Sequence, residues 1–317
     1  MVRALFLLLA SGLLTSCLHE PPASTRLAGS LLDALHAQYG APTQVFNYSP
    51  QRVDVFRTAG GGALAVGSNA FLDVTGSPVA TPLRLELREI VTKADMVLSG
   101  TTSMVGNEVY ESAGQYYVQA SPDDHRPLLL SPRVKLGLAA PGPPQLFTLL
   151  GLGLFQAPAP GPPPAAWQPA ADTASSVRPG TVLAATNPLY LRCLIAKGLY
   201  DRGNGWVCFA RGIYNGYPKT TVRVATGQPA ADAGNAAVYL VFHAYNAVAQ
   251  LVPNGLGEFT QANIPTNTPV TVFALYSADG QLYLGQRQDT VRAGQVFTLN
   301  LAPRSLVEIA AEARRIP

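Results

Sequence analysis

Apolar and polar side chains alternate in short runs along most of the chain after residue 52. Residues 83–88 have the sequence Leu-Arg-Leu-Glu-Leu-Arg, in which every second side chain is apolar. Successive side chains of a β-strand point to opposite faces, so this pattern predicts a strand with one buried and one solvated face. Further strand-like runs, separated by turn clusters, lie at 53–56, 114–120 and 127–130. Together they predict a first β-domain over residues 53–140, an antiparallel sandwich or small barrel.

Residues 141–180 are rich in proline, and 157–166 contain only Pro, Ala and Gly. Proline has no backbone N–H and favours extended backbone in the residue before it. This composition predicts a semi-stiff linker. Strand-like runs resume at 190–195, 206–209, 220–224, 237–242, 270–276, 282–284 and 295–299. The chain from 181 to 317 is therefore predicted to form a second β-rich domain.

Three local signals predict a hairpin and two helices. Asp279-Gly280 stands between two strand-like runs and predicts a two-residue hairpin turn. Every fourth residue from Leu27 to Tyr39 is large and apolar or aromatic, which predicts an amphipathic helix over 26–40. Ser305 and Glu308 form a capping-box pattern at the start of a C-terminal helix. The predicted fold class is mainly β: two antiparallel sandwich or barrel-like domains, with a short N-terminal and a C-terminal helix.

The first sixteen residues consist of a short start containing Arg3 and a run of apolar and small residues. A run of about 10–14 such residues is too short to span a bilayer and is typical of a secretory signal peptide. The run ends at Leu-Thr-Ser-Cys17, which resembles the lipobox of bacterial lipoproteins. That resemblance implies a signal peptide over 1–16, a diacylglycerol cysteine at Cys17, and a polar tether over 17–25. The alternative is an ordinary signal peptide with a chance cysteine.

A lipidated Cys17 would place the protein in the cell envelope, held to a membrane by its lipid. Leu18 stands where an aspartate retains many lipoproteins at an inner membrane, so the outer membrane is the favoured location. The tether carries only one acidic residue, Glu20, which gives little support for display at the cell surface.

Net charge and cysteine count narrow the possible partners and covalent links of the protein further. The formal net charge is +3, and loss of Arg3 with the signal peptide leaves +2 (3 − 1), too little for a nucleic-acid partner. Two cysteines remain besides Cys17, namely Cys193 and Cys208. In an oxidising compartment they would form a disulfide, and the alternative is a pair of buried thiols.

Two stretches, residues 61–118 and 205–242, resemble a family of poorly characterised bacterial envelope lipoproteins. The first stretch contains Gly61-Gly62-Ala63-Leu64, and the second contains Gly205-Trp206-Val207-Cys208. The family's first module is loosely similar to the ZU-type β-domain of ankyrins and netrin receptors. The resemblance implies a β-rich, lipid-anchored envelope protein and supplies no catalytic residue. The chain departs from the family pattern at Phe209-Ala210-Arg211, where an acidic residue before a basic one is expected.

No catalytic motif emerges from the sequence, so we predict no enzyme activity, cofactor or metal site. The chain has no Gly-x-Ser-x-Gly, Walker loop or His-Glu-x-x-His. Asp123-Asp124-His125 is better explained as a solvated turn than as a metal site, because adjacent ligands rarely converge on one ion. Glu86 and Glu89 are three apart on a predicted strand, so their carboxylates would point to opposite faces.

Exposed aromatic residues are the remaining functional signal. Trp206, Tyr214 and Tyr217 form a candidate ligand surface for stacking on a glycan or peptide. The function hypothesis is a non-catalytic binding or scaffolding module that contacts an envelope protein or a glycan. The alternatives are a glycan- or peptidoglycan-acting hydrolase whose acidic residues assemble only in the fold, and a component of a larger outer-membrane assembly.

Overall fold

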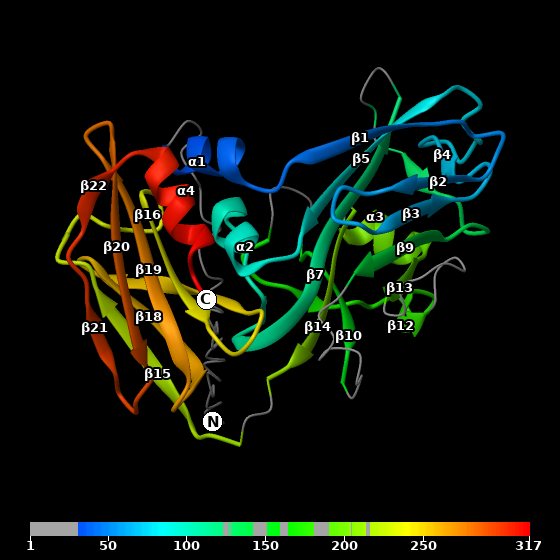
Figure 1. Cartoon of the computed structure of the whole chain (residues 1–317). Coiled ribbons are helices and arrows are strands. Elements are labelled where there is room, and N and C mark those ends of the chain that lie inside the picture. Colours follow the sequence, from blue (N-terminus) through cyan, green and yellow to red (C-terminus); the bar gives the residue numbers. More distant parts are fainter. Residues whose placement is uncertain are drawn as a thin grey trace, which may run out of the picture.

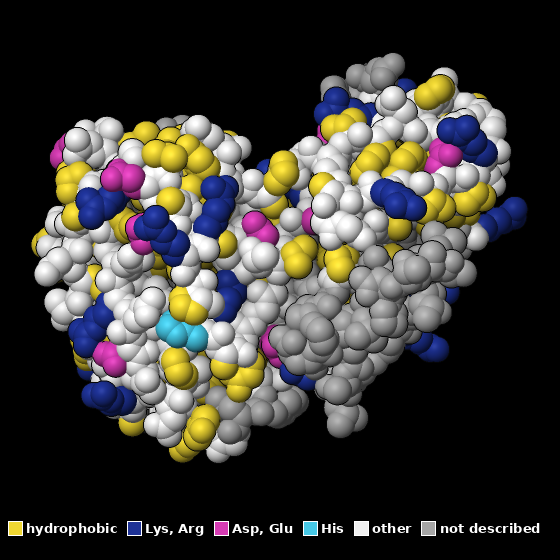
Figure 2. Space-filling view, in the orientation of Figure 1, with side chains coloured by type: hydrophobic (Ala, Val, Ile, Leu, Met, Phe, Trp, Pro, Cys, Tyr) yellow, Lys and Arg dark blue, Asp and Glu magenta, His cyan; other side chains and the backbone are white. Residues whose placement is uncertain are grey.

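The protein is mainly β, as predicted, and its strands gather in two lobes (Figures 1 and 2). The computed structural model describes residues 31–122, 126, 128–141, 151–158, 164–180, 190–203, 205–213 and 216–317. The predicted signal peptide, Cys17 and the tether lie outside these residues. Within the described chain, no helix is both long and apolar enough to cross a bilayer.

The first lobe is a sandwich of two antiparallel sheets. One sheet has the order β1-β5-β7-β14-β10-β11, with β6 beside β7, and the other has the order β12-β13-β9-β3-β2. The first sheet comprises β1 (Thr43–Tyr48), β5 (Leu83–Ile90), β6 (Met104–Val105), β7 (Glu108–Ser121), β10 (Gly153–Gln156), β11 (Gln168–Pro169) and β14 (Trp206–Gly212). The second comprises β2 (Asp54–Arg57), β3 (Ala63–Val66), β9 (Leu136–Pro141), β12 (Ser176–Gly180) and β13 (Tyr190–Ile195). Beside them lie the strand pair β4 (Phe71–Leu72) and β8 (Leu129–Leu130), and helix α3 (Lys197–Gly203).

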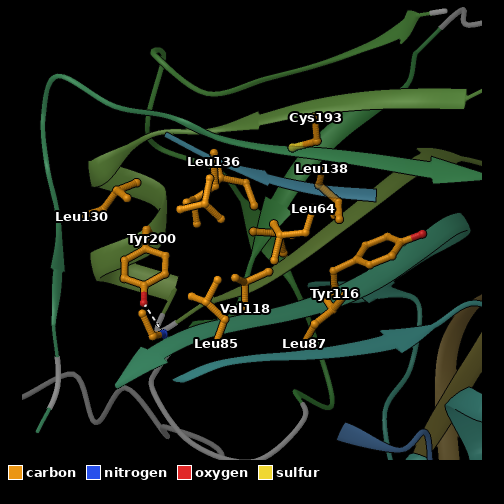
Figure 3. Packing of buried hydrophobic residues seen from close by; sticks show 14 of the residues in the cluster. Leu64, Leu85, Leu87, Tyr116, Val118, Leu130, Leu136, Leu138, Cys193 and Tyr200 are labelled. Carbon is orange, nitrogen blue, oxygen red and sulfur yellow. Dashed lines mark hydrogen bonds between the residues drawn. The ribbon is translucent and has the colours of Figure 1, made fainter. Parts of the chain in front are cut away.

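Leucines at alternate positions of β5 face the core between these sheets, as the sequence pattern predicts. Leu85 and Leu87 are fully buried and share one cluster with Val118 of β7 (Figure 3). Leu64 and Leu138 enter the same cluster from the opposite sheet. Burial of these side chains from water is the main stabilising contribution to this lobe.

The second lobe is one curled sheet with the order β21-β15-β18-β17-β16-β19-β20-β22. Its strands are β15 (Lys219–Ala225), β16 (Ala236–Phe242), β17 (Val248–Gly255), β18 (Glu258–Pro265), β19 (Pro269–Ala278), β20 (Gln281–Thr290), β21 (Val296–Thr298) and β22 (Ala302–Arg304). β19 and β20 are joined by Asp279 and Gly280, whose φ angles are 50° and 71°. Positive φ at both positions matches a type I′ turn, so the predicted hairpin is confirmed.

Three helices lie where the lobes meet: α1 (Leu31–Tyr39), α2 (Lys93–Ser99) and α4 (Leu306–Arg314) (Figure 1). Side chains of all three share one buried cluster with strands of both lobes. The predicted C-terminal helix is confirmed, and Ser305 and Glu308 form its capping box. The described part of the predicted N-terminal helix is α1, and residues 26–30 lie outside the described chain.

Sheet pairing moves the predicted domain boundary. The predicted linker over 141–180 contains β10, β11 and β12, which all belong to the sheets of the first lobe. β13 and β14, assigned from sequence to the second domain, pair with β9 and with β7. The chain therefore passes to the second lobe between Gly212 and Lys219. The physical reason is that β14 inserts between β7 and β10, a pairing across a long sequence separation that local composition does not encode.

Candidate functional site

A pocket with a volume of about 380 Å³ opens on the second lobe, beside α1 and α4. Its walls come from the start of α1, the turn between β19 and β20, strand β22 and the first turn of α4. The lining residues are Leu31, Gly280, Gln281, Leu282, Pro303, Arg304, Ser305, Leu306 and Glu308. Three segments that are distant in sequence thus converge on one hollow.

Backbone pairing and helix capping position the polar groups of this pocket. Arg304 lies on β22, opposite Leu282 of β20. Ser305 donates to the Glu308 carboxylate through its backbone N–H at 2.8 Å and its hydroxyl at 2.7 Å. These hydrogen bonds, with Arg304 nearby, hold the pKa of Glu308 below its usual value. Glu308 is therefore an ionised acceptor already engaged by the helix cap.

The remaining groups of the pocket are suited to binding. Leu31, Leu282 and Leu306 provide apolar walls, and Arg304 and Gln281 provide hydrogen-bond donors at the rim. This combination of an apolar hollow and a few polar groups is typical of a site that holds an apolar side chain next to a polar backbone or head group.

The predicted aromatic ligand surface is not assembled by the fold. Trp206 is only 2% exposed, and its ring centroid lies 5.0 Å from that of Tyr117 and 6.4 Å from that of Trp167. The prediction is wrong for Trp206, because the alternation of β14 points this indole into the core that contains the helices. Tyr217 is 48% exposed and stays available for contact. Tyr214 lies outside the described residues.

Cys193 and Cys208 are both buried free cysteines, so of the two alternatives that the sequence leaves open, the structure has the pair of buried thiols. Cys193 lies in the core between the sheets of the first lobe, whereas Cys208 lies in the core that contains the helices. The two side chains therefore leave their strands toward different cores. Burial raises the pKa of both thiols, that of Cys208 to about 12, so neither is a ready nucleophile at neutral pH.

The carboxylates of Glu86 and Glu89 have structural roles. Glu89 accepts hydrogen bonds from Gln44 Nε2 at 2.7 Å, Thr58 Oγ1 at 2.7 Å and the Gly60 N–H at 2.9 Å. Glu86 pairs with Arg84 at 2.9 Å. Residues 58–61 form a turn beside Glu89, closed by a hydrogen bond from the Gly61 N–H to the Thr58 carbonyl, and Gly61 has a φ of 83°.

Asp123-Asp124-His125 lies outside the described residues. In the part of the chain that the structure describes, no group of three or more His, Cys, Asp or Glu side chains is placed to hold a metal ion.

A polar junction missed by sequence reasoning joins the two lobes. The Lys93 ammonium, at the start of α2, donates to the carbonyls of Phe242 at 2.8 Å and His243 at 3.1 Å. The His243 imidazole Nε2 lies 2.9 Å from Thr271 Oγ1. Asn246 Nδ2 donates to the carbonyls of Val91 and Ser112, each at 2.8 Å. The connection between β16 and β17 is therefore hydrogen-bonded directly to the first lobe.

The His243 imidazole should make stability depend on pH. Burial lowers its pKa, and the Lys93 ammonium lowers it further. Below the unfolded-state pKa of about 6.5, the unfolded chain binds this proton more readily than the folded chain, so stability falls as the pH decreases through that value. We expect His243→Gln to reduce the loss of Tm between about pH 7.5 and about pH 5. Parallel Tm profiles for the two proteins would contradict this.

Comparison with known proteins places the chain in no family. A scan of protein-family models finds none that matches the chain, and a search of curated proteins finds no similar sequence. The resemblance to envelope lipoproteins with a ZU-type-like domain stays a prediction from the sequence.

Proposed function

We propose that this protein is a lipid-anchored envelope lipoprotein that serves as a non-catalytic binding or scaffolding module. Cys17 carries the lipid, and the β-rich lobes form a rigid body that contacts an envelope protein or a glycan. A diacylated or triacylated cysteine supplies the two or more acyl chains that stable anchoring requires. The outer membrane is the proposed location.

The observation that carries this proposal is the position of α1. This helix is the first described element after the proposed tether, and Leu35 within it is fully buried. Leu35 shares a cluster with Phe273 of the second lobe and Trp206 of the first. A force applied at the amino terminus would therefore reach both lobes at once. The two lobes would therefore move on the tether as one body.

The hydrogen bonds between the lobes support the same proposal. Besides the contacts of Lys93 and Asn246, the Ser103 N–H donates to the Val248 carbonyl at 2.9 Å, and the Ser112 N–H donates to the Asn246 carbonyl at 2.9 Å. Bonds of this kind at a shared apolar core oppose hinge motion, because opening would leave buried polar groups without partners.

Anchoring is tested by Cys17→Ser in the natural host. We expect the wild-type protein to incorporate labelled palmitate and to sediment with membranes, and Cys17→Ser to lose the label and leave the membrane fraction. Cys193→Ala is the matched control. It removes a buried thiol that carries no lipid, so this variant should keep the label. Release of wild-type protein into the medium without acyl groups would contradict the anchor.

Binding is tested separately with the intact, lipidated protein. A photo-crosslinking residue at Gln281 samples the pocket, and one at Tyr217 samples the exposed aromatic position. We expect at least one of them to give a discrete crosslinked product in cells. The same residue at Asp232, an exposed position in a turn away from the pocket lining, is the control. Turnover of peptidoglycan fragments by the purified protein would instead support the hydrolase alternative.

A further inference from the structure

β1 has an unusual free edge. It is the first strand of its sheet and pairs only with β5, over all six residues from Thr43 to Tyr48. Within the described chain, its other side has no strand partner. In Figure 1, β1 (dark blue) runs beside β5 near the top of the first lobe. A free strand edge presents unpaired N–H and C=O groups in a row, which is a template for another extended chain.

The other sheet edges are protected in the ways that natural proteins use. β2 contains Asp54 and Arg57, and β22 is a three-residue strand with Pro303 and Arg304. β11 and β12 each contain a proline, and β21 has three residues. Charges, prolines and short length all discourage the addition of a further strand. β1 has the sequence Thr-Gln-Val-Phe-Asn-Tyr, with no charge and no proline, and its register with β5 has no bulge.

Apolar side chains flank both sides of this edge. On the outer face of the sheet, Val45 is 47% exposed. On the inner side, the Phe46 ring stacks on Phe56 of β2, with centroids 4.9 Å apart, and both are only partly buried. A strand added beside β1 would cover Val45 with one side chain and the Phe46–Phe56 stack with the next.

A cationic side chain, Arg88, lies on β5, the neighbour of β1 in the sheet. Arg88 of β5 is opposite Thr43, its Nε is buried without a hydrogen-bond partner in the described chain, and its neighbour Glu86 is occupied by Arg84. Adjacent strands are about 4.8 Å apart, so the long Arg88 side chain can reach across Thr43 to a carboxylate on an added strand. The open backbone edge of β1, the apolar Val45 and Phe46, and the Arg88 cation thus fit the same kind of partner, an extended chain with apolar and acidic side chains.

We propose that β1 binds an extended segment of a partner polypeptide by strand addition, with apolar side chains facing Val45 and Phe46 and an acidic side chain facing Arg88. This proposal deepens the proposed binding function and rests on it. It gives that function a surface separate from the pocket, and it does not depend on the lipid at Cys17.

The test uses a displayed library of random nine-residue peptides, selected on the intact folded chain and then measured as synthetic peptides. We expect selected peptides to alternate apolar residues with at least one Asp or Glu, and to slow hydrogen exchange of amides in β1. Val45→Glu should weaken their binding at least about tenfold, because a charge on an edge strand opposes strand addition and a carboxylate on this face repels the acidic side chain of the peptide. Arg88→Gln should weaken it by a smaller factor.

Val55→Glu is the matched control. Val55 lies on β2, is 52% exposed, and receives the same change at the protected edge of the other sheet. Binding should be retained in this variant. The proposal is overturned if no peptide is selected, if binding survives Val45→Glu, or if the protected amides lie outside β1. It is also overturned if the protein alone dimerises through β1, because the occupant would then be a second copy. None of these results changes the outcome of the palmitate experiment, so the two proposals fail separately.

Discussion

Trp206→Ala is expected to destabilise the protein by about 3–5 kcal/mol, because it removes a large side chain from a packed core and leaves a cavity. The indole lies between Tyr117 and Trp167 in the core that contains the helices of both lobes. Loss of this contact should lower the midpoint of urea unfolding and also loosen the lobe junction.

Tyr217→Ala is the control for this change. Tyr217 is about half exposed, so its truncation should change the free energy of unfolding by no more than about 0.5 kcal/mol. The two variants separate two roles that the sequence did not distinguish. Removal of a core aromatic side chain lowers stability, whereas removal of a surface aromatic side chain weakens only binding. Equal unfolding midpoints for wild type and Trp206→Ala would restore Trp206 as a surface residue.

Gly205→Ala is expected to destabilise the protein by about 3–4 kcal/mol. Gly205 precedes β14 with a φ of 81°, and a Cβ at this position would lie 2.0 Å from the Val118 carbonyl oxygen. That oxygen belongs to β7, a central strand, and the Val118 N–H donates to the Gly205 carbonyl at 2.9 Å. The clash is therefore with backbone that cannot move without breaking the sheet.

Gly76→Ala isolates the conformational part of this effect. Gly76 has a similar φ of 86°, but a Cβ there would have no neighbour within 4 Å. Only the cost of the left-handed backbone remains, about 1–2 kcal/mol. Urea unfolding of both variants should give a difference of about 2 kcal/mol. If the two lose the same stability, the close approach of Gly205 to β7 is not a constraint on the fold.

Local signals identified elements whose stabilising contacts are near in sequence. The Asp279-Gly280 turn and the Ser305–Glu308 capping box each depend on residues within four positions of one another. The sequence also contains local capping signals for α2, a helix that the hydrophobic pattern alone does not predict. Thr92 and Asp95 form a capping box, and Gly100 ends the helix with a φ of 67°. At seven residues α2 is too short to show a helical period.

The residues of the candidate site were harder to predict from the sequence than these elements. Leu31, Leu282, Arg304 and Leu306 line one pocket, yet nothing in their local patterns links them. The lobe junction has the same character, because Lys93 and His243 are far apart in the chain. The sequence predicts a ligand surface that includes Trp206, and burial of this side chain removes it from any surface.

By itself, the sequence determined the β-rich class, the strand faces, the hairpin and the terminal helix. These follow from alternation, φ preference and capping, which are properties of neighbouring residues. Only the tertiary structure decided that β13 and β14 belong to the first lobe, that Cys193 and Cys208 face different cores, and that β1 lacks a second strand partner among the described residues. Strand order depends on which distant segments bury the most apolar surface together, and that quantity belongs to the whole chain rather than to any stretch of it.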